Sequence, residues 1–213
     1  MTRQIRRARE DDASFLAWAT LAATRSHCDK GWFDIALNRP EPECLEFLRR
    51  LTATATRSLW HYSRFFVAEV EGAPVAALAA FRAADAFPFA QQAMTEAARG
   101  LGWSQSEQEA IWRRGAYIFT CTLETPDDAW AIENIATLPA HRGQGLAGRL
   151  IEGALEEAVD KGAREALIAF FIGNDVAERT YRKAGFRFKD EKRHPDFEGA
   201  TGVPGLRRYA RKL

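Results

Sequence analysis

The chain has 213 residues, of which 46% are apolar, and its 30 Lys and Arg side chains nearly balance its 29 Asp and Glu side chains. That length and apolar content suffice for one well-buried core, and the near-neutral charge argues against nucleic acid or an anionic membrane surface as a partner. The three cysteines are odd in number and widely spaced, so we expect neither a disulfide framework nor a metal site.

The N-terminal segment, beginning Met1-Thr2-Arg3, is charged and lacks the apolar region of a secretory signal. No apolar run approaches the roughly 20 residues needed to cross a bilayer. We therefore expect a cytoplasmic protein without a membrane partner. Because no Gly/Ser-rich or Pro-rich linker divides the chain, residues 1–213 are expected to form a single domain.

The first eighty residues are predicted to contain one strand, three helical segments and a β-hairpin. Asp11 or Asp12 is expected to cap the first helix, in which apolar residues recur at helical spacing. In the hairpin, two β-rich runs bracket a Glu-Gly turn, and Pro74 begins the second run, where a missing N–H is tolerated. The predicted segments are a strand over 4–8, helices over 11–23, 31–38 and 43–56, and hairpin strands over 65–71 and 74–82.

Residues 84–115 are predicted to be helical. One helix covers about 89–100, and Ser104 with Glu107 forms a capping-box pattern that opens a second helix. The later segments alternate between strands and helices and end in a strand pair. They comprise an apolar strand over 130–138, a helix over 146–161, a strand over 165–172, a short helix begun by Asn174 and stopped by Gly185, and strands over 186–193 and 206–213.

A glycine turn joins the strand over 130–138 to the helix over 146–161. Backbone N–H groups at a helix start lack intrahelical partners and carry the positive end of the helix dipole, so such a turn predicts a phosphate or pyrophosphate site. Gly143-x-Gly145-x-x-Gly148 also matches the dinucleotide fingerprint of a Rossmann fold. Too few strand–helix repeats follow Gly148 for that fold, and no Gly-Lys-Ser/Thr follows the turn to make it a P-loop.

Two sequence blocks carry a stronger signal together. Arg142-x-x-Gly145-x-Ala147 follows the strand, and Asn174-x-x-Ala177-x-x-x-Tyr181-x-x-x-Gly185-Phe186 follows about 30 residues later. In order and spacing these blocks resemble the GNAT superfamily of acyl-CoA-dependent N-acetyltransferases. The resemblance is close over about 132–188 and loose in the N-terminal half.

The resemblance implies an α/β (α+β) fold, with a mixed, mainly antiparallel sheet of six or seven strands flanked by helices. It makes residues 84–115 a helical insertion and 130–188 the acyl-CoA-binding core. It also implies acetyl transfer from acetyl-CoA to a primary amine of a small molecule or peptide, directly within a ternary complex. The alternative is a non-catalytic acyl-CoA sensor or interaction module on the same fold. Three roles remain open for the insertion over 84–115: a wall of the substrate site, a contact in a homodimer, or packing alone.

By the same resemblance, backbone N–H groups of the glycine turn would bind the CoA pyrophosphate. Those of the preceding strand would pair with the pantetheine arm and the thioester oxygen, and Asn174 would bind the pantetheine or cap its helix. The cofactor-binding residues expected on this basis are Ile135, Ala136, Thr137, Arg142, Gly143, Gln144, Gly145, Leu146, Ala147, Gly148, Asn174, Ala177 and Tyr181.

Two side chains are candidates for proton transfer. An amine with a pKa of about 10 must lose a proton before it attacks, and Glu133 could take it, directly or through water. Strand alternation places Glu133 on the same face as Ile135 and Thr137, although a salt bridge to an arginine would equally explain a carboxylate there. Tyr181 could protonate the leaving thiolate, as the tyrosine at this motif position often does in the family, or it could be a core tyrosine with a satisfied hydroxyl.

Overall fold

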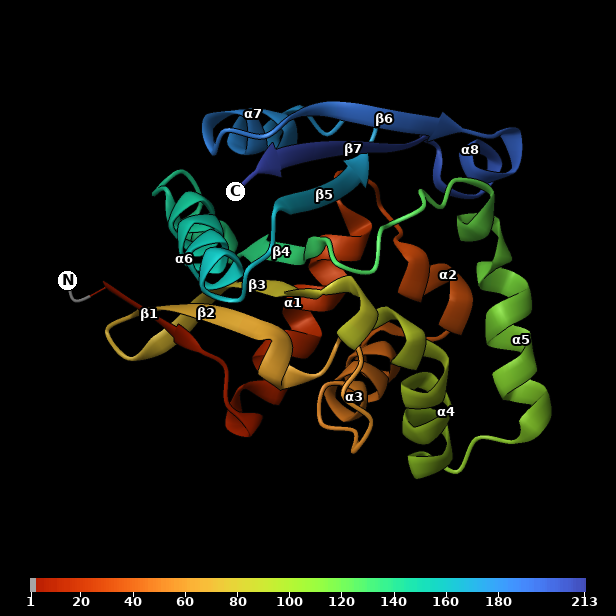
Figure 1. Ribbon diagram of the computed structural model, residues 1–213. Coiled ribbons are helices and arrows are strands. Elements are labelled where there is room, and N and C mark those ends of the chain that lie inside the picture. Colours follow the sequence, from red (N-terminus) through yellow and green to blue (C-terminus); the bar gives the residue numbers. More distant parts are fainter. Residues whose placement is uncertain (1–2) are drawn as a thin grey trace.

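The computed structural model describes residues 3–213, and Figure 1 shows them as a central sheet with helices on both sides. The strands follow the order β1-β2-β3-β4-β5-β7-β6. Among the described residues, β4 and β5 are the parallel neighbours and the other pairs are antiparallel, which confirms the mixed, mainly antiparallel sheet. The strands are β1 (Arg3–Arg7), β2 (Phe65–Val70), β3 (Ala73–Arg82), β4 (Trp130–Thr137), β5 (Glu165–Phe171), β6 (Arg187–Arg193) and β7 (Gly205–Lys212).

A two-residue turn joins β2 to β3, since Val70 pairs with Ala73. Glu71 and Gly72 both have positive φ, at 53° and 83°. Two-residue hairpin loops of this kind match the right-handed twist of the flanking strands, and glycine adopts the conformation without steric strain. The predicted hairpin is therefore confirmed.

The two faces of the sheet bury different residues of β3. Ala76, Leu78 and Ala80 pack in the cluster formed with helix α6 (Leu146–Asp160). Ala77 and Ala79 pack in the cluster formed with helix α1 (Ala13–Arg25). This period-2 alternation places α6 and α1 on opposite faces of the central strands.

Eight α-helices lie within residues 3–213, and none of them is long and apolar enough to cross a membrane. Asp12 precedes α1, but its carboxylate accepts from the Arg9 N–H (2.7 Å) and makes no hydrogen bond to the first turn of that helix. The remaining helices are α2 (Trp32–Leu37), α3 (Glu41–Leu51), α4 (Ala90–Gly100), α5 (Gln105–Gly115), α7 (Asp175–Lys183) and α8 (Pro195–Thr201).

Helix α3 starts and ends earlier than the predicted 43–56. Pro42 lies in its first turn, where a missing N–H removes no helical hydrogen bond. Beyond Leu51, the hydroxyls of Thr52 and Thr54 donate to the backbone carbonyls three residues earlier, at 2.9 and 3.1 Å. Such local side-chain bonds compete with a continuing helix, so α3 stops at Leu51.

The predicted helical segment over 84–115 forms α4 and α5, which pack against α3 and α2 (Figure 1). Ser104 and Glu107 form the expected capping box at the start of α5. At its end, Trp32 Nε1 donates to the Gly115 carbonyl at 3.0 Å. The segment thus completes a layer of helices with the N-terminal part of the chain.

Candidate functional site

Strands β4 and β5 pair over only part of their length. The register runs from Trp130 opposite Ala166 to Ile132 opposite Ile168, and no further pairing follows. We call the region beyond these pairs, where β4 and β5 share no sheet hydrogen bonds, the opening. Because the N–H of Leu138 donates to β3 (Val75 carbonyl, 2.8 Å), the neighbouring N–H of Thr137 faces the opposite edge, toward the opening.

A β-bulge lies in β4 where the opening begins. Ala79 pairs with Glu133 and Ala77 pairs with Ala136, so two β4 residues lie opposite one residue of β3. Asn134 is one of the two, and it adopts a left-handed conformation with φ of 52°. Bulges insert one residue into a strand and so shift the alternation of all that follows.

The bulge makes one prediction wrong. Glu133 pairs with Ala79 and therefore lies on the α1 face of the sheet, whereas Ile135 packs in the α6 cluster. Simple alternation had placed the two side chains on one face. Ala136, one residue later, packs on the α1 face with Ala131.

Glu133 is half-buried and has no ion pair or hydrogen bond to another described residue. The salt bridge considered as the alternative is therefore not found within residues 3–213. Desolvation raises the pKa of Glu133 to about 7, because burial without a counter-charge disfavours the ionised form. The carboxyl can thus change protonation state near neutral pH.

Tyr181 lies on α7 and is buried, at 8% exposure, against Phe170, with ring centroids 5.3 Å apart. Its hydroxyl donates to no described residue, yet it is not among the fully buried polar atoms, so it keeps contact with solvent. Burial raises the pKa of Tyr181, and the negative charge of Glu133 raises it further. The phenol thus lies within electrostatic reach of the carboxyl, although Tyr181 packs in the α6 cluster and Glu133 lies on the α1 face.

Asn174 caps α7, as one of its two expected roles requires. Its Oδ1 accepts from the Ala177 N–H at 3.0 Å, and Ala177 packs against the α6 cluster. Its Nδ2 donates to Ser26 Oγ at 2.7 Å, across 148 positions of sequence. The link to Ser26 was not predicted, and no sequence pattern indicates it.

The glycine turn leaves main-chain donors unpaired. Gly143 and Gly145 have φ of 74° and 75°, and a Cβ at either position would meet open space. Within the described chain, no acceptor bonds their N–H groups or those of Leu146, Ala147 and Gly148, the first turn of α6. Five donors at a positive helix end fit a diphosphate.

The remaining residues expected at the turn are exposed. Arg142 Nε donates to the Thr137 carbonyl at 3.3 Å, which holds the guanidinium between the end of β4 and the turn. Gln144 Nε2 donates to the Ala140 carbonyl at 3.4 Å. Arg142 therefore adds positive charge beside the unpaired N–H groups.

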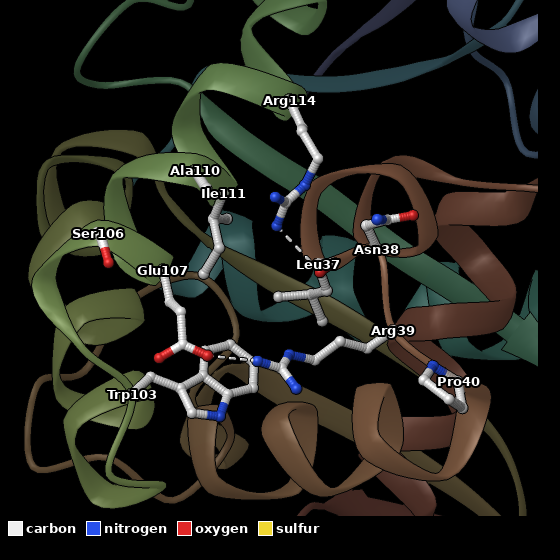
Figure 2. A pocket seen from close by; sticks show the side chains of 10 residues that line it. All are labelled: Leu37, Asn38, Arg39, Pro40, Trp103, Ser106, Glu107, Ala110, Ile111 and Arg114. Carbon is white, nitrogen blue, oxygen red and sulfur yellow. Dashed lines mark hydrogen bonds and ion pairs between the residues drawn. The ribbon is translucent and has the colours of Figure 1, made fainter.

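A cavity of about 450 Å³ lies elsewhere, between α5 and the α2–α3 connection (Figure 2). Arg39 donates to Glu107 across it at 2.6 Å, and its guanidinium lies over the Trp103 ring, 4.5 Å from the centroid. Arg114 donates to the Leu37 carbonyl at 3.0 Å. These charged groups are already paired, and no residue of β4, α6 or α7 lines the cavity, so we place the candidate site at the opening.

The mixed, mainly antiparallel sheet, with β4 and β5 parting beside an unpaired helix start, is the fold of the acetyltransferase class. The sequence model of the acetyltransferase (GNAT) family matches residues 32–186, and the chain therefore belongs to that family. None of the curated proteins matches the sequence.

Solved structures share the fold at low sequence identity. An N-acetyltransferase from Staphylococcus aureus Mu50 aligns with a TM-score of 0.71 and 19% identity, over 98% of this chain and 100% of that one. An agmatine N-acetyltransferase variant aligns with a TM-score of 0.56 and 18% identity, over 99% of each chain. An aminoglycoside acetyltransferase in complex with coenzyme A aligns with a TM-score of 0.55 and 16% identity, over 99% of this chain and 95% of that one.

Proposed function

We propose that this protein transfers the acetyl group of acetyl-CoA to a primary amine within a ternary complex. The family supports acyl transfer to an amine in general. The observation that carries the finer proposal is the pairing, at the opening, of an unpartnered Glu133 with a pKa of about 7 and a Tyr181 whose pKa is raised. One group can accept a proton near neutral pH while the other holds one.

The fit to coenzyme A rests on the unpaired N–H groups of the glycine turn. Gly143, Gly145 and the first turn of α6 would hold the pyrophosphate, with Arg142 adding charge. The N–H of Thr137 at the edge of β4 would bond the pantetheine arm. When bound, the cofactor supplies a thioester whose acyl carbon is open to attack by an amine.

The protein's own groups would then move the protons that the transfer requires. Glu133, ionised above about pH 7, takes the proton of the substrate ammonium, directly or through water. The amine nitrogen forms its bond to the acyl carbon, and the carbon–sulfur bond breaks. Tyr181, kept protonated by its raised pKa, gives its proton to the departing sulfur, and the second proton of the attacking nitrogen passes to the resulting phenolate, directly or through water, so that the amide product is neutral. Main-chain N–H groups at the edge of β4 would stabilise the charge on the acyl oxygen, at about 3 kcal/mol per donor.

The acceptor class extends to small amines and peptide amines. Two of the structures that share the fold are named for acetylation of agmatine and of aminoglycosides, which are both amines. Their identity to this chain is below 20%, so the proposal carries the amine group over and not the particular molecule.

The test is an amine panel with acetyl-CoA, read out as release of free thiol, beside calorimetric titration with CoA. We expect turnover with at least one amine and CoA binding in its absence. Tyr181→Phe should lower kcat by about 100-fold or more while leaving CoA affinity within about twofold, since general acids contribute 10²–10⁴.

Tyr209→Phe is the matched control. Tyr209 is also a buried tyrosine in contact with Phe170, but its hydroxyl donates to Glu178 at 2.6 Å and lies in a structural network. It should lose stability and keep kcat. CoA binding without turnover on any amine would instead support the sensor alternative and refute the proposed function.

A further inference from the structure

Ser26 ends helix α1 in a backbone conformation that is unusual for serine. Its φ and ψ are 57° and −114°, and the Cys28 N–H donates to the Arg25 carbonyl at 2.9 Å. Residues 25–28 thus form a turn of the II′ type, with Ser26 at the position where glycine is favoured. A serine held there carries backbone strain that a glycine would relieve.

The side chain of Ser26 makes a contact that glycine could not make. Its Oγ accepts from Asn174 Nδ2 at 2.7 Å and lies 3.2 Å from His27 Nδ1. The same Asn174 accepts from the Ala177 N–H through its Oδ1. One amide side chain therefore fastens the first turn of α7 to the end of α1.

This contact joins an element that packs on β4 to an element that follows β5. Helix α1 packs on β4, which carries Glu133, while Asn174 follows β5 and starts the helix that carries Tyr181. Backbone pairing between β4 and β5 stops at Ile132, short of Glu133. The strand that holds the carboxyl and the helix that holds the phenol therefore have no sheet hydrogen bonds joining them at that level.

We propose that Ser26 is a positioning residue: its hydroxyl, through Asn174, fixes the phenol of Tyr181 relative to the carboxyl of Glu133 across the opening. The proposal rests on the acetyl transfer proposed above, in which these two groups act on the same pair of reacting molecules. Transfer between groups held about 3 Å from the reacting atoms is sensitive to misplacement, and an error of about 1 Å can lower the rate 100-fold.

The test replaces the two partners singly and together. Ser26→Gly keeps the turn and removes the hydroxyl, and Asn174→Ser keeps a good helix cap but is too short to reach across. We expect Ser26→Gly to lower kcat about tenfold or more, with the KM for acetyl-CoA unchanged and thermal stability not reduced. In the free protein, amide hydrogen exchange in 175–181 should be faster than in the wild type.

The double variant isolates the contact. Ser26→Gly with Asn174→Ser should be no slower than Asn174→Ser alone, because each single change already breaks the same bond. Asn38→Gly is the control for the relief of backbone strain, because Asn38 also ends a helix at positive φ (50°). Asn38 lies beside the cavity between α5 and the α2–α3 connection. The control variant should leave kcat and the exchange in 175–181 unchanged.

Three results would overturn the positioning role: a wild-type kcat in Ser26→Gly, unchanged exchange in 175–181, or rate losses that multiply in the double variant. A wild-type protein that releases no thiol with any amine would overturn the proposed function itself. The exchange measurement on the free protein separates these two failures, because it needs no substrate.

Discussion

Replacing Glu133 with glutamine should lower kcat by at least about 100-fold and, at alkaline pH, make the protein more stable. The carboxyl has no counter-charge among the described residues, and desolvation raises its pKa from 4.5 to about 7. Below pH 4.5 the group is neutral in both the folded and the unfolded chain. As pH rises through 4.5 and on to 7, the unfolded chain ionises first, so the wild type loses stability over that window.

The size of the loss follows from the shift. A difference of one pKa unit is 1.36 kcal/mol, so a shift of this size corresponds to roughly 3 kcal/mol at pH 8, as an upper limit because the side chain is only half-buried. Glutamine cannot ionise and avoids the loss. The variant and the wild type should therefore be nearly equal at pH 4 and differ most at pH 8.

The stability of the wild type alone would hide this effect. Burial lowers the pKa of His61 from 6.5 to about 4, so His61 contributes stability that is lost as pH falls from 6.5 toward 4. The two slopes oppose one another across nearly the same window. The difference in unfolding free energy between Glu133→Gln and the wild type reports on the carboxyl alone, because the contribution of His61 is the same in both proteins and cancels.

The assay is chemical denaturation of both proteins at pH 4, 6 and 8, beside the pH dependence of kcat. The wild-type kcat should rise with pH to a plateau above about 7, and we call this rise the kinetic limb. In Glu133→Gln the kinetic limb should be absent, and kcat should be lower by at least about 100-fold. Glu69→Gln is the control, because Glu69 is also a strand glutamate but pairs with Arg6 at 2.6 Å. It should lose stability at pH 8 and keep the kinetic limb.

The reasoning would be refuted if Glu133→Gln were destabilised at pH 8, since the carboxylate would then have a stabilising partner. A variant that kept the kinetic limb near pH 7 would show that another group accepts the proton. Either result can be read without knowledge of the physiological acceptor, provided one amine is turned over.

Three further predictions concern the glycine turn and the helical layer. Gly148→Ala and Gly153→Ala should each stabilise the free protein by about 0.5–1 kcal/mol, since both lie in α6 and a Cβ would not clash, but only Gly148→Ala should weaken CoA binding in a titration. Arg142→Ala should weaken CoA binding. The loss of affinity should be smaller at about 1 M salt, because salt screens the attraction between an exposed arginine and a phosphate. Ser104→Ala should lower the unfolding free energy by about 1 kcal/mol through loss of the α5 cap, with kcat unchanged.

The parts of the fold that follow from local chemistry could be predicted from the sequence. The turn at Gly143 and Gly145 needs positive φ, which glycine supplies, and the Ser104 cap is a pairing between residues three apart. Asn174 as the cap of α7 follows in the same way. Each of these depends on residues near one another in the chain, where spacing carries the information.

The features that were missed depend on residues distant in sequence or on weak signals. The position of the bulge, at Asn134, depends on the register between β4 and β3, although asparagine is among the residues that tolerate a left-handed conformation. No helix is predicted between the strands over 186–193 and 206–213, yet Pro195 at the start of α8 and Gly202 after its end form a recognisable pair of helix signals. The Ser26–Asn174 contact has no local signal at all.

The sheet ends at β6, and this strand bears on how copies of the protein could associate. Every residue of β6 except Phe188 is charged. An unpaired strand edge is otherwise a template for another chain, and a dense row of charges of both signs makes backbone pairing with a second copy unfavourable. Growth of a continuous intermolecular sheet from this side is therefore disfavoured, which protects a protein with an open sheet from aggregation during folding.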